Sequence, residues 1–175
     1  FETRMDVKVD EYVEMIRLKT SVLLAAAMKI GACLADAPAQ DAEKLYEFGV
    51  KIGLAFQLQD DWLDVYGDPK VFGKNIGGDI LCNKKTFMLI TALEEANEEQ
   101  RAALEGWLAA REYVPAEKIA AVTALYNEIG VGKRCQEMAE ALNAEGFAIL
   151  DSINLPEERK AVLKKYACSM LNRNV

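Results

Sequence analysis

The sequence predicts an all-α bundle, and two observations favour this fold class. Apolar residues recur with helical spacing along almost the whole chain, and proline or glycine separates one such stretch from the next. No internal repeat, low-complexity tract or alternating strand of useful length interrupts this pattern. With 175 residues, of which 51% are hydrophobic, the chain suits one compact domain or a substantial piece of a larger one.

The first two predicted helices are long and buried. From about Asp10 to Ala35 apolar residues lie on every side, a pattern typical of a helix in the middle of a bundle. This helix ends at Ala37-Pro38, because a proline disfavours helical backbone in the residue before it. A second helix of similar character covers about residues 42–66, roughly seven turns, and stops at Gly67-Asp68-Pro69.

Shorter helices follow one long irregular segment. Residues 67–83 contain four glycines and a proline, and loops of this length in compact domains are usually functional or disordered. Pro115 and Pro156 stand at predicted helix N-termini, and Gly130 and Gly132 at a C-terminal stop. The predicted helices cover residues 84–96, 99–111, 116–129, 133–153 and 157–172.

Composition excludes several classes of protein. The net charge of −7 argues against nucleic acid as the main partner. Four widely spaced cysteines form no zinc pattern and predict reduced thiols. The longest apolar run, residues 22–28, is too short to span a membrane, and no secretory leader is present, so we expect a cytoplasmic protein. The chain begins at Phe1 without an initiator methionine, which fits a piece of a longer protein.

Asp60, Asp61 and Asp64 form an acidic cluster inside an apolar stretch. On a helix Asp60 and Asp64 are one turn apart, roughly 5–6 Å, with Asp61 beside them. Carboxylates this close repel one another, and aspartate is a weak helix former, so the cluster is unfavourable unless a cation binds it. Oxygen ligands in a chain without histidine indicate a hard ion such as Mg²⁺. An EF-hand is excluded because there is no DxDxDG loop.

Basic residues follow the acidic cluster: Lys74, then Lys84 and Lys85 after Gly77-Gly78-Asp79. Metal together with lysine is a common way to hold a diphosphate, and glycines let a loop close over it. The spacing does not match a Walker loop, because GxxxxGK[ST] is absent. A loop of glycine and lysine is more often a solvated connection, and its position beside the aspartates favours a phosphate-binding lid here.

Lys19 and Thr20 lie in the middle of the first predicted helix. An unpaired buried ammonium costs several kcal/mol, so Lys19 either extends to solvent at the bundle edge or faces a polar cavity. Gln57 precedes the first two aspartates by three and four residues, shares their face and would look into the same cavity. Tryptophans, tyrosines and methionines at helical spacing are interpreted as core residues.

The chain resembles a known family. FQLQDDWLDVYGDP and GKNIGGDILCNKKT are similar to the second aspartate-rich region of the trans-isoprenyl diphosphate synthases, the farnesyl and geranylgeranyl diphosphate synthase family. The segment from Met15 to Thr20 resembles the Lys-Thr helix that precedes this region in the family. The resemblance covers residues 15–86 and implies part of the helical bundle of the isoprenoid synthase type, with the N-terminal helices missing.

This resemblance implies a Mg²⁺-dependent, short-chain prenyltransferase of isoprenoid biosynthesis that condenses an allylic diphosphate with isopentenyl diphosphate, and a homodimer. It implies that Asp60 binds Mg²⁺ directly while Asp61 and Asp64 hold its waters or complete its shell. The implied substrate residues are Lys19, Lys74 and Lys84 for the diphosphate, Thr20 and Gln57 with the Lys19 carbonyl for the carbocation, and Phe56 for the wall of a hydrophobic tunnel.

One departure from the family matters. Family members carry two aspartate-rich motifs, and this chain has the later one alone. We therefore expect residues 1–175 to be the C-terminal part of a single all-helical domain, with negligible turnover on their own. Two alternatives stay open: a non-catalytic subunit of the same fold that binds a prenyl diphosphate or a catalytic partner, and a helical interaction protein whose aspartates face water.

Overall fold

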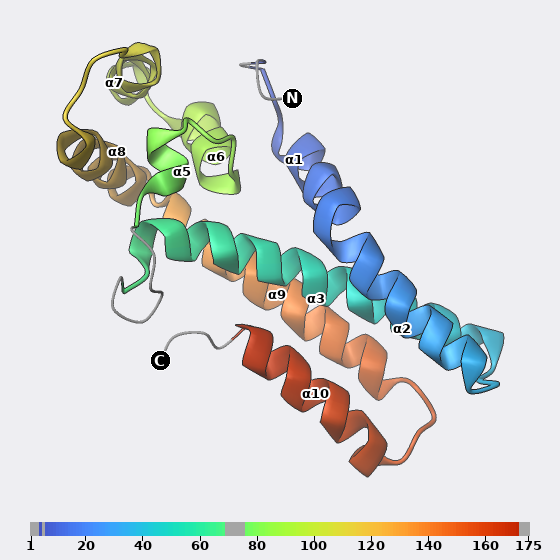
Figure 1. The fold of residues 1–175 in the computed structure, drawn as a ribbon. Helices are drawn as coiled ribbons and strands as arrows, with labels where there is room; N and C mark the ends of the chain where they lie inside the picture. The colour runs from blue at the N-terminus through green and yellow to red at the C-terminus, as the bar shows by residue number, and fades with distance from the viewer. Residues whose placement is uncertain (1–3, 5, 69–75, 172–175) are drawn as a thin grey trace. The chain divides into compact units, whose positions relative to one another are not determined.

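The computed structural model describes residue 4 and residues 6–68 and 76–171, which form helices and connections without a strand (Figure 1). The predicted all-α fold class is confirmed. The described residues fall into two compact units. Unit 1 holds those up to Tyr12 and those from Asp60 to Gln136, and unit 2 holds Val13–Gln59 and those from Glu137 onward. Within the described ranges, no helix is both long enough and apolar enough to cross a membrane.

The first predicted helix is present, but it contains a π-helical turn. Helix α1 (Val9–Ile16) continues into the π-helical turn η1 (Arg17–Ser21) and then into α2 (Val22–Leu34). A π-helical turn carries one residue more than an α-helical turn and often marks a functional site. The sequence did not predict it, and it contains both Lys19 and Thr20.

Helix α3 (Ala39–Tyr66) is the long second helix that the sequence predicts. In unit 2 it approaches the preceding helical stretch so closely that two of its positions have no room for a side chain. A Cβ atom at Gly49 would lie 2.6 Å from the Ala25 Cα, and one at Gly53 would lie 2.7 Å from the Ser21 Cα. Small residues on both helices therefore fix the distance between them.

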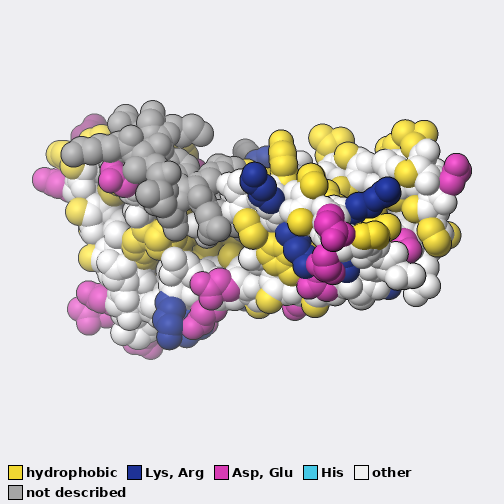
Figure 2. All heavy atoms as spheres, turned by 90° about the horizontal axis from the view of Figure 1, so that it is seen from below, with side chains coloured by type: hydrophobic (Ala, Val, Ile, Leu, Met, Phe, Trp, Pro, Cys, Tyr) yellow, Lys and Arg dark blue, Asp and Glu magenta, His cyan; other side chains and the backbone are white. Residues whose placement is uncertain are grey.

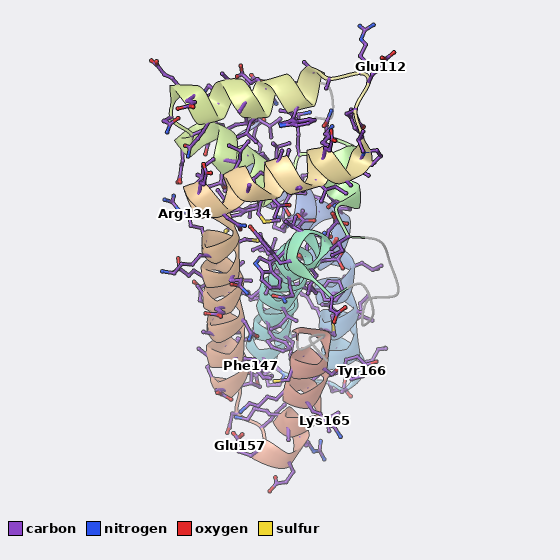
Figure 3. The ribbon with its side chains drawn as sticks, turned by 90° about the vertical axis from the view of Figure 1, so that its left-hand side faces the viewer. Glu112, Arg134, Phe147, Glu157, Lys165 and Tyr166 are labelled. Atoms are coloured by element: carbon purple, nitrogen blue, oxygen red, sulfur yellow. The ribbon has the colours of Figure 1, made fainter. Side chains whose placement is uncertain are left out.

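The core of unit 2 joins α3 to the last two helices, α9 (Val131–Asp151) and α10 (Glu157–Leu171). Figure 1 shows α9 running beside α3. The rings of Phe48 and Phe147 lie 6.3 Å apart between their centroids, and Phe147 is labelled in Figure 3. The buried residues of this core are Phe48, Ile52, Leu150, Ile153 and Ala167.

The expectation that the first helix is buried on every side is wrong for α2. Leu23, Ile30 and Leu34 are 79%, 58% and 82% exposed. Their spacing of seven and four residues places them on one face of the helix. The apolar pattern is real, but the described part of the chain does not cover this face. Figure 2 shows that hydrophobic side chains are also exposed among charged ones on the face seen from below.

Unit 1 gathers shorter helices with clear end signals. They are α5 (Gly78–Leu81), α6 (Phe87–Glu95), α7 (Glu98–Ala109) and α8 (Pro115–Ile129). Thr86 caps α6, and Asn97 and Gln100 form a capping box at α7. Arg134, labelled in Figure 3, forms an ion pair with Glu95 of α6.

Three local predictions in unit 1 have different outcomes. Pro115 begins α8, and Gly130 ends it in the left-handed region with φ of 83°, as predicted. Gly132 does not end a helix: it lies in α9, where a Cβ atom would come within 2.7 Å of the Tyr66 ring. The segment 67–83 is not irregular throughout, because α5 forms one helical turn in it.

The close contact at Gly53 gives a stability prediction. Gly53→Ala should lower the free energy of unfolding by about 1–3 kcal/mol, because the new methyl group overlaps the backbone of Ser21. Gly31→Ala is the matched control: its Cβ meets nothing within 4 Å, so we expect a gain of about 0.5–1 kcal/mol from helix propensity. Urea denaturation measures both, and equal stability of the two variants would contradict the close contact.

Candidate functional site

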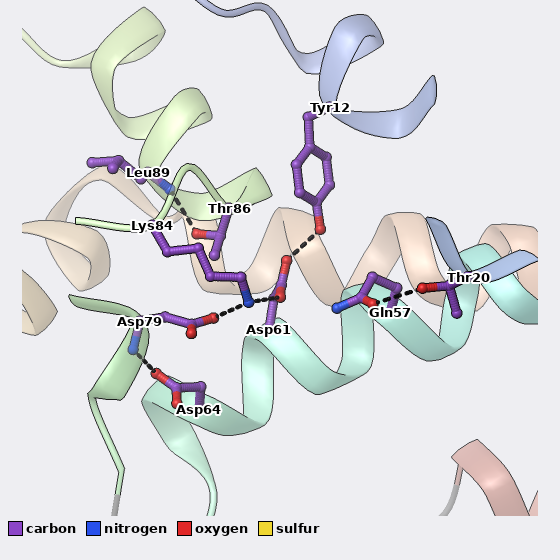
Figure 4. Close-up of polar contacts among 9 residues, drawn as sticks. All are labelled: Tyr12, Thr20, Gln57, Asp61, Asp64, Asp79, Lys84, Thr86 and Leu89. Carbon is purple, nitrogen blue, oxygen red and sulfur yellow. Dashed lines mark hydrogen bonds and ion pairs between the residues drawn. The ribbon is translucent and has the colours of Figure 1, made fainter. Parts of the chain in front are cut away.

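Asp61 is the centre of a polar cluster in unit 1. The residue is 1% exposed, and both carboxylate oxygens accept hydrogen bonds (Figure 4). The Tyr12 hydroxyl donates to Oδ2, and the Lys84 ammonium donates to Oδ1 over 3.1 Å. A buried carboxylate needs such donors because its charge is poorly solvated. The cluster thus joins α1, α3 and the segment that follows α5.

Lys84 also binds a second carboxylate, which sequence reasoning did not assign to the site. Its Nζ donates to Asp79 Oδ2 over 2.5 Å. The Asp79 backbone N–H in turn donates to Asp64 Oδ2 over 2.8 Å, and the Gly77 N–H donates to the Asp64 carbonyl over 2.6 Å. These contacts attach the first turn of α5 to the C-terminal end of α3.

Gly77 makes this attachment possible. It precedes α5 with φ of 84°, in the left-handed region that favours glycine. A Cβ atom there would also lie 2.7 Å from the Ile119 side chain on α8. Both the backbone conformation and the close approach therefore require a glycine at this position.

Burial and charge act in opposite directions on the groups of the cluster. Burial raises the pKa of Asp61 above its usual range, although Lys84 and Tyr12 both act to lower it. Burial likewise raises the pKa of Asp64. For Lys84, burial alone would lower the pKa, but Asp61 and Asp79 outweigh it and the pKa is raised. Lys84 is therefore fully cationic at neutral pH.

Thr20 and Gln57 meet in unit 2. The Thr20 hydroxyl donates to Gln57 Oε1 over 3.1 Å, and both side chains are part-buried (Figure 4). Thr20 comes from the π-helical turn and Gln57 from α3. The two predicted neutral dipoles are thus paired with each other. Lys19, in the same π-helical turn as Thr20, is exposed in the described part of the chain.

A divalent cation was expected at the aspartates, and the donor set fits one in part. Asp60 and Asp64 are part-buried carboxylates one helical turn apart on α3, whereas Tyr12 and Lys84 bind the oxygens of Asp61. No ready-made cage of three or more ligating side chains occurs among the described residues. Mg²⁺ does not need one, because it is commonly held by one or two carboxylates, waters and substrate phosphates.

The predicted site residues have separate outcomes. Asp61, Asp64 and Lys84 belong to one hydrogen-bonded cluster with Asp79. Phe56 is part-buried on α3, and Lys74 lies outside the described residues.

Two residues of the cluster were missed. Asp79 stands in the glycine-rich motif noted in the sequence, which was a usable signal. Tyr12 was interpreted as core, and no sequence pattern reveals the partner of its hydroxyl.

The contact between Tyr12 and Asp61 gives the next prediction. Tyr12→Phe should lower the free energy of unfolding by about 1–3 kcal/mol, because a buried carboxylate loses one of its donors. Tyr166→Phe serves as the control, since Tyr166 is 70% exposed, and it should leave stability unchanged. Chemical denaturation compares the two; equal effects would mean that the Tyr12 hydroxyl does not stabilise Asp61.

Comparison with known proteins agrees with the resemblance seen in the sequence. The family model described as polyprenyl synthetase matches residues 1–129. The (2E,6E)-farnesyl diphosphate synthase of Mycobacterium tuberculosis is 35% identical over 178 residues, which cover 99% of this chain and 49% of that protein.

Two solved structures extend the match to the fold. A crystal structure of a geranylgeranyl pyrophosphate synthase matches with a TM-score of 0.91 and 34% identity, over 100% of this chain and 54% of that one. The geranylgeranyl pyrophosphate synthase of Corynebacterium glutamicum, complexed with isoprenyl diphosphate and magnesium, matches with a TM-score of 0.84 and 30% identity, over 95% of this chain and 47% of that one. The chain spans about half the length of these relatives. It belongs to the polyprenyl synthetase family.

Proposed function

We propose that this chain is part of a short-chain trans-prenyltransferase that joins an allylic diphosphate to isopentenyl diphosphate. The observation that carries the proposal is the cluster in which the DDxxD residues Asp61 and Asp64 are linked to Lys84 and Asp79. Family membership and the names of the relatives support the same reaction class. The farnesyl diphosphate synthase of Mycobacterium tuberculosis, which matches 99% of this chain, supports a short product.

The charges of the cluster support a requirement for a divalent cation. When ionised, Asp61, Asp64 and Asp79 bring three negative charges against the single positive charge of Lys84, which leaves an excess of two, and Asp60 adds a further carboxylate beside Asp61 in the sequence. Such a surface repels a diphosphate unless a cation binds first. We propose that Asp60 and Asp64 hold Mg²⁺, the ion present in the Corynebacterium relative.

Lysines complete the proposed diphosphate site. A bound Mg²⁺ would offset the negative charge that develops on the leaving diphosphate. Lys84 stays cationic beside its carboxylates and adds charge-assisted hydrogen bonds to phosphate oxygens. Lys19 and Lys74 are proposed to bind the same group, on the resemblance alone. Asp61 keeps Lys84 in place and completes the outer shell of the metal.

Thr20 and Gln57 suit the carbocation that forms in this reaction. The C–O bond of the allylic diphosphate breaks with its electron pair on the diphosphate, and the double bond of isopentenyl diphosphate attacks the cation. Loss of a proton, which the released diphosphate accepts, restores a double bond. Neutral oxygen dipoles stabilise such a cation without trapping it, and Thr20 and Gln57 offer these dipoles. Phe56 is proposed as an apolar wall.

We further propose that residues 1–175 are the C-terminal part of one all-helical domain that works as a homodimer. The exposed apolar face of α2 supports the proposal that further polypeptide packs against this helix. Large exposed apolar side chains on one helix face commonly mark an interface. The match to about half the length of the relatives supports the incomplete domain, and the homodimer is proposed on the resemblance alone.

A binding experiment on the full-length product of the gene tests the metal site. Mg²⁺ with a bisphosphonate should raise the melting temperature, by an amount equivalent to about 2.7 kcal/mol at a hundred times the dissociation constant. Asp60→Asn combined with Asp64→Asn should abolish this shift, because the two metal-binding carboxylates are lost.

Glu112→Gln is the control, since Glu112 is exposed and outside the cluster (Figure 3). No shift in the parent protein would favour a helical interaction protein. A shift without turnover on allylic diphosphate, isopentenyl diphosphate and Mg²⁺ would favour the non-catalytic subunit.

Turnover by the 175-residue chain alone gives a further prediction. We expect negligible prenyl transfer from labelled isopentenyl diphosphate, because one aspartate-rich motif supplies half of the family's metal site. Circular dichroism confirms that the chain is helical in the assay. Robust product from this chain would overturn the proposal that it is an incomplete domain.

A further inference from the structure

Lys118 on α8 is a buried lysine that forms no ion pair with a carboxylate among the described residues. The residue is 1% exposed. Its Nζ donates to Asn83 Oδ1 over 2.7 Å and lies 4.4 Å from the centre of the Tyr113 ring. Burial lowers the pKa of Lys118. An apolar side chain of the same length would avoid the desolvation of the ammonium.

The partner of Lys118 occupies a special position in the backbone. Asn83 has φ of 51°, in the left-handed region that asparagine tolerates better than most residues. Its Nδ2 donates to the Leu108 carbonyl over 3.0 Å, while Oδ1 accepts from Lys118. Tyr113 donates its hydroxyl to the Leu81 carbonyl over 3.2 Å. Groups on α7, before α8 and on α8 thus bond the end of α5 and the turn after it at three points.

This turn aims the next residue, Lys84, at the acidic cluster. The Lys84 N–H donates to the Asp79 carbonyl over 2.9 Å, and its ammonium binds Asp61 and Asp79. Asp79, Asn83, Lys84 and Lys118 line one small pocket, together with apolar side chains of α6, α7 and α8. Lys118 therefore bonds Asn83, the residue directly before Lys84.

We propose that Lys118 is a positioning residue: by holding the side chain of Asn83 it fixes the left-handed turn that directs Lys84 onto Asp61 and Asp79. This inference rests on the proposed function of Lys84 in prenyl transfer. With Lys118 bound to Oδ1 and the Leu108 carbonyl bound to Nδ2, both polar atoms of the Asn83 side chain are held. An apolar side chain in place of Lys118 would leave Oδ1 without this donor, which explains why a buried ammonium is present.

A double-mutant cycle in the full-length product of the gene tests this role. Lys118→Met should lower kcat/KM roughly 10- to 100-fold, as expected for a displaced site residue, while the melting temperature changes by less than about 4 °C. In the Lys84→Met background the same substitution should have no further effect, because Lys118 acts through Lys84. Lys165→Met, at an exposed lysine of α10 (Figure 3), is the control and should be neutral.

Other outcomes separate this inference from the function on which it rests. The inference is overturned if the losses of kcat/KM from the two single substitutions multiply in the double variant. It is also overturned if the loss of kcat/KM in Lys118→Met follows a fall in melting temperature, because either result assigns Lys118 a structural role alone. Absence of prenyl transfer in the parent protein would overturn the proposed function instead.

A crystal structure of the Lys118→Met variant decides the geometry independently of activity. We expect the Lys84 ammonium to lie beyond about 4 Å from Asp61, and an unchanged ion pair would refute the inference. Asn83→Gly replaces Lys118→Met in every measurement if the latter does not fold, because glycine can still adopt the left-handed turn but loses the side-chain bonds that fix it.

Discussion

The buried carboxylate of Asp61 is the constraint on which the rest of unit 1 depends. Its burial opposes ionisation, and the Tyr12 hydroxyl and the Lys84 ammonium offset that effect. Removing one partner of a buried ion pair commonly costs about 3–5 kcal/mol, because the remaining charge is left uncompensated. The donors come from α1 and from the segment after α5, so folding must bring both to α3 before the carboxylate is satisfied. One polar side chain thereby fixes three segments that are distant in the sequence.

Local signals made most helices predictable. The predicted and observed bounds of α3, α7, α8 and α10 agree within about three residues, because proline, glycine and capping residues mark their ends. The π-helical turn η1 and the short helix α5 were not predicted. Each depends on contacts with other elements: Ser21 approaches Gly53 closely, and α5 is attached to Asp64. Apolar periodicity likewise could not indicate that no described part of the chain covers one face of α2.

In the candidate site, too, residues with a local sequence signal were predictable and residues defined by contacts between elements were not. The three aspartates of α3 were identifiable because they oppose both helix propensity and electrostatics, so their presence required an explanation. Tyr12 and Lys118 conflict with no such rule: a tyrosine in an apolar helix resembles core, and a lysine near a helix start resembles a solvated residue. Their roles arise from hydrogen bonds to Asp61 and Asn83, which are distant in sequence. Polar partners across elements are a property of the folded chain.

The geometry implies that the charged residues of the candidate site have different roles. Lys84 is bound to two carboxylates, Asp61 and Asp79, so much of its charge is already balanced. In the proposed site its ammonium therefore adds directed hydrogen bonds to the diphosphate rather than much net positive charge, and it is held in place by Asp61. Asp60 and Asp64 are less buried and stand one turn apart on α3. We infer that a cation on these two carboxylates provides the attraction, and that the buried half of the motif keeps them in place.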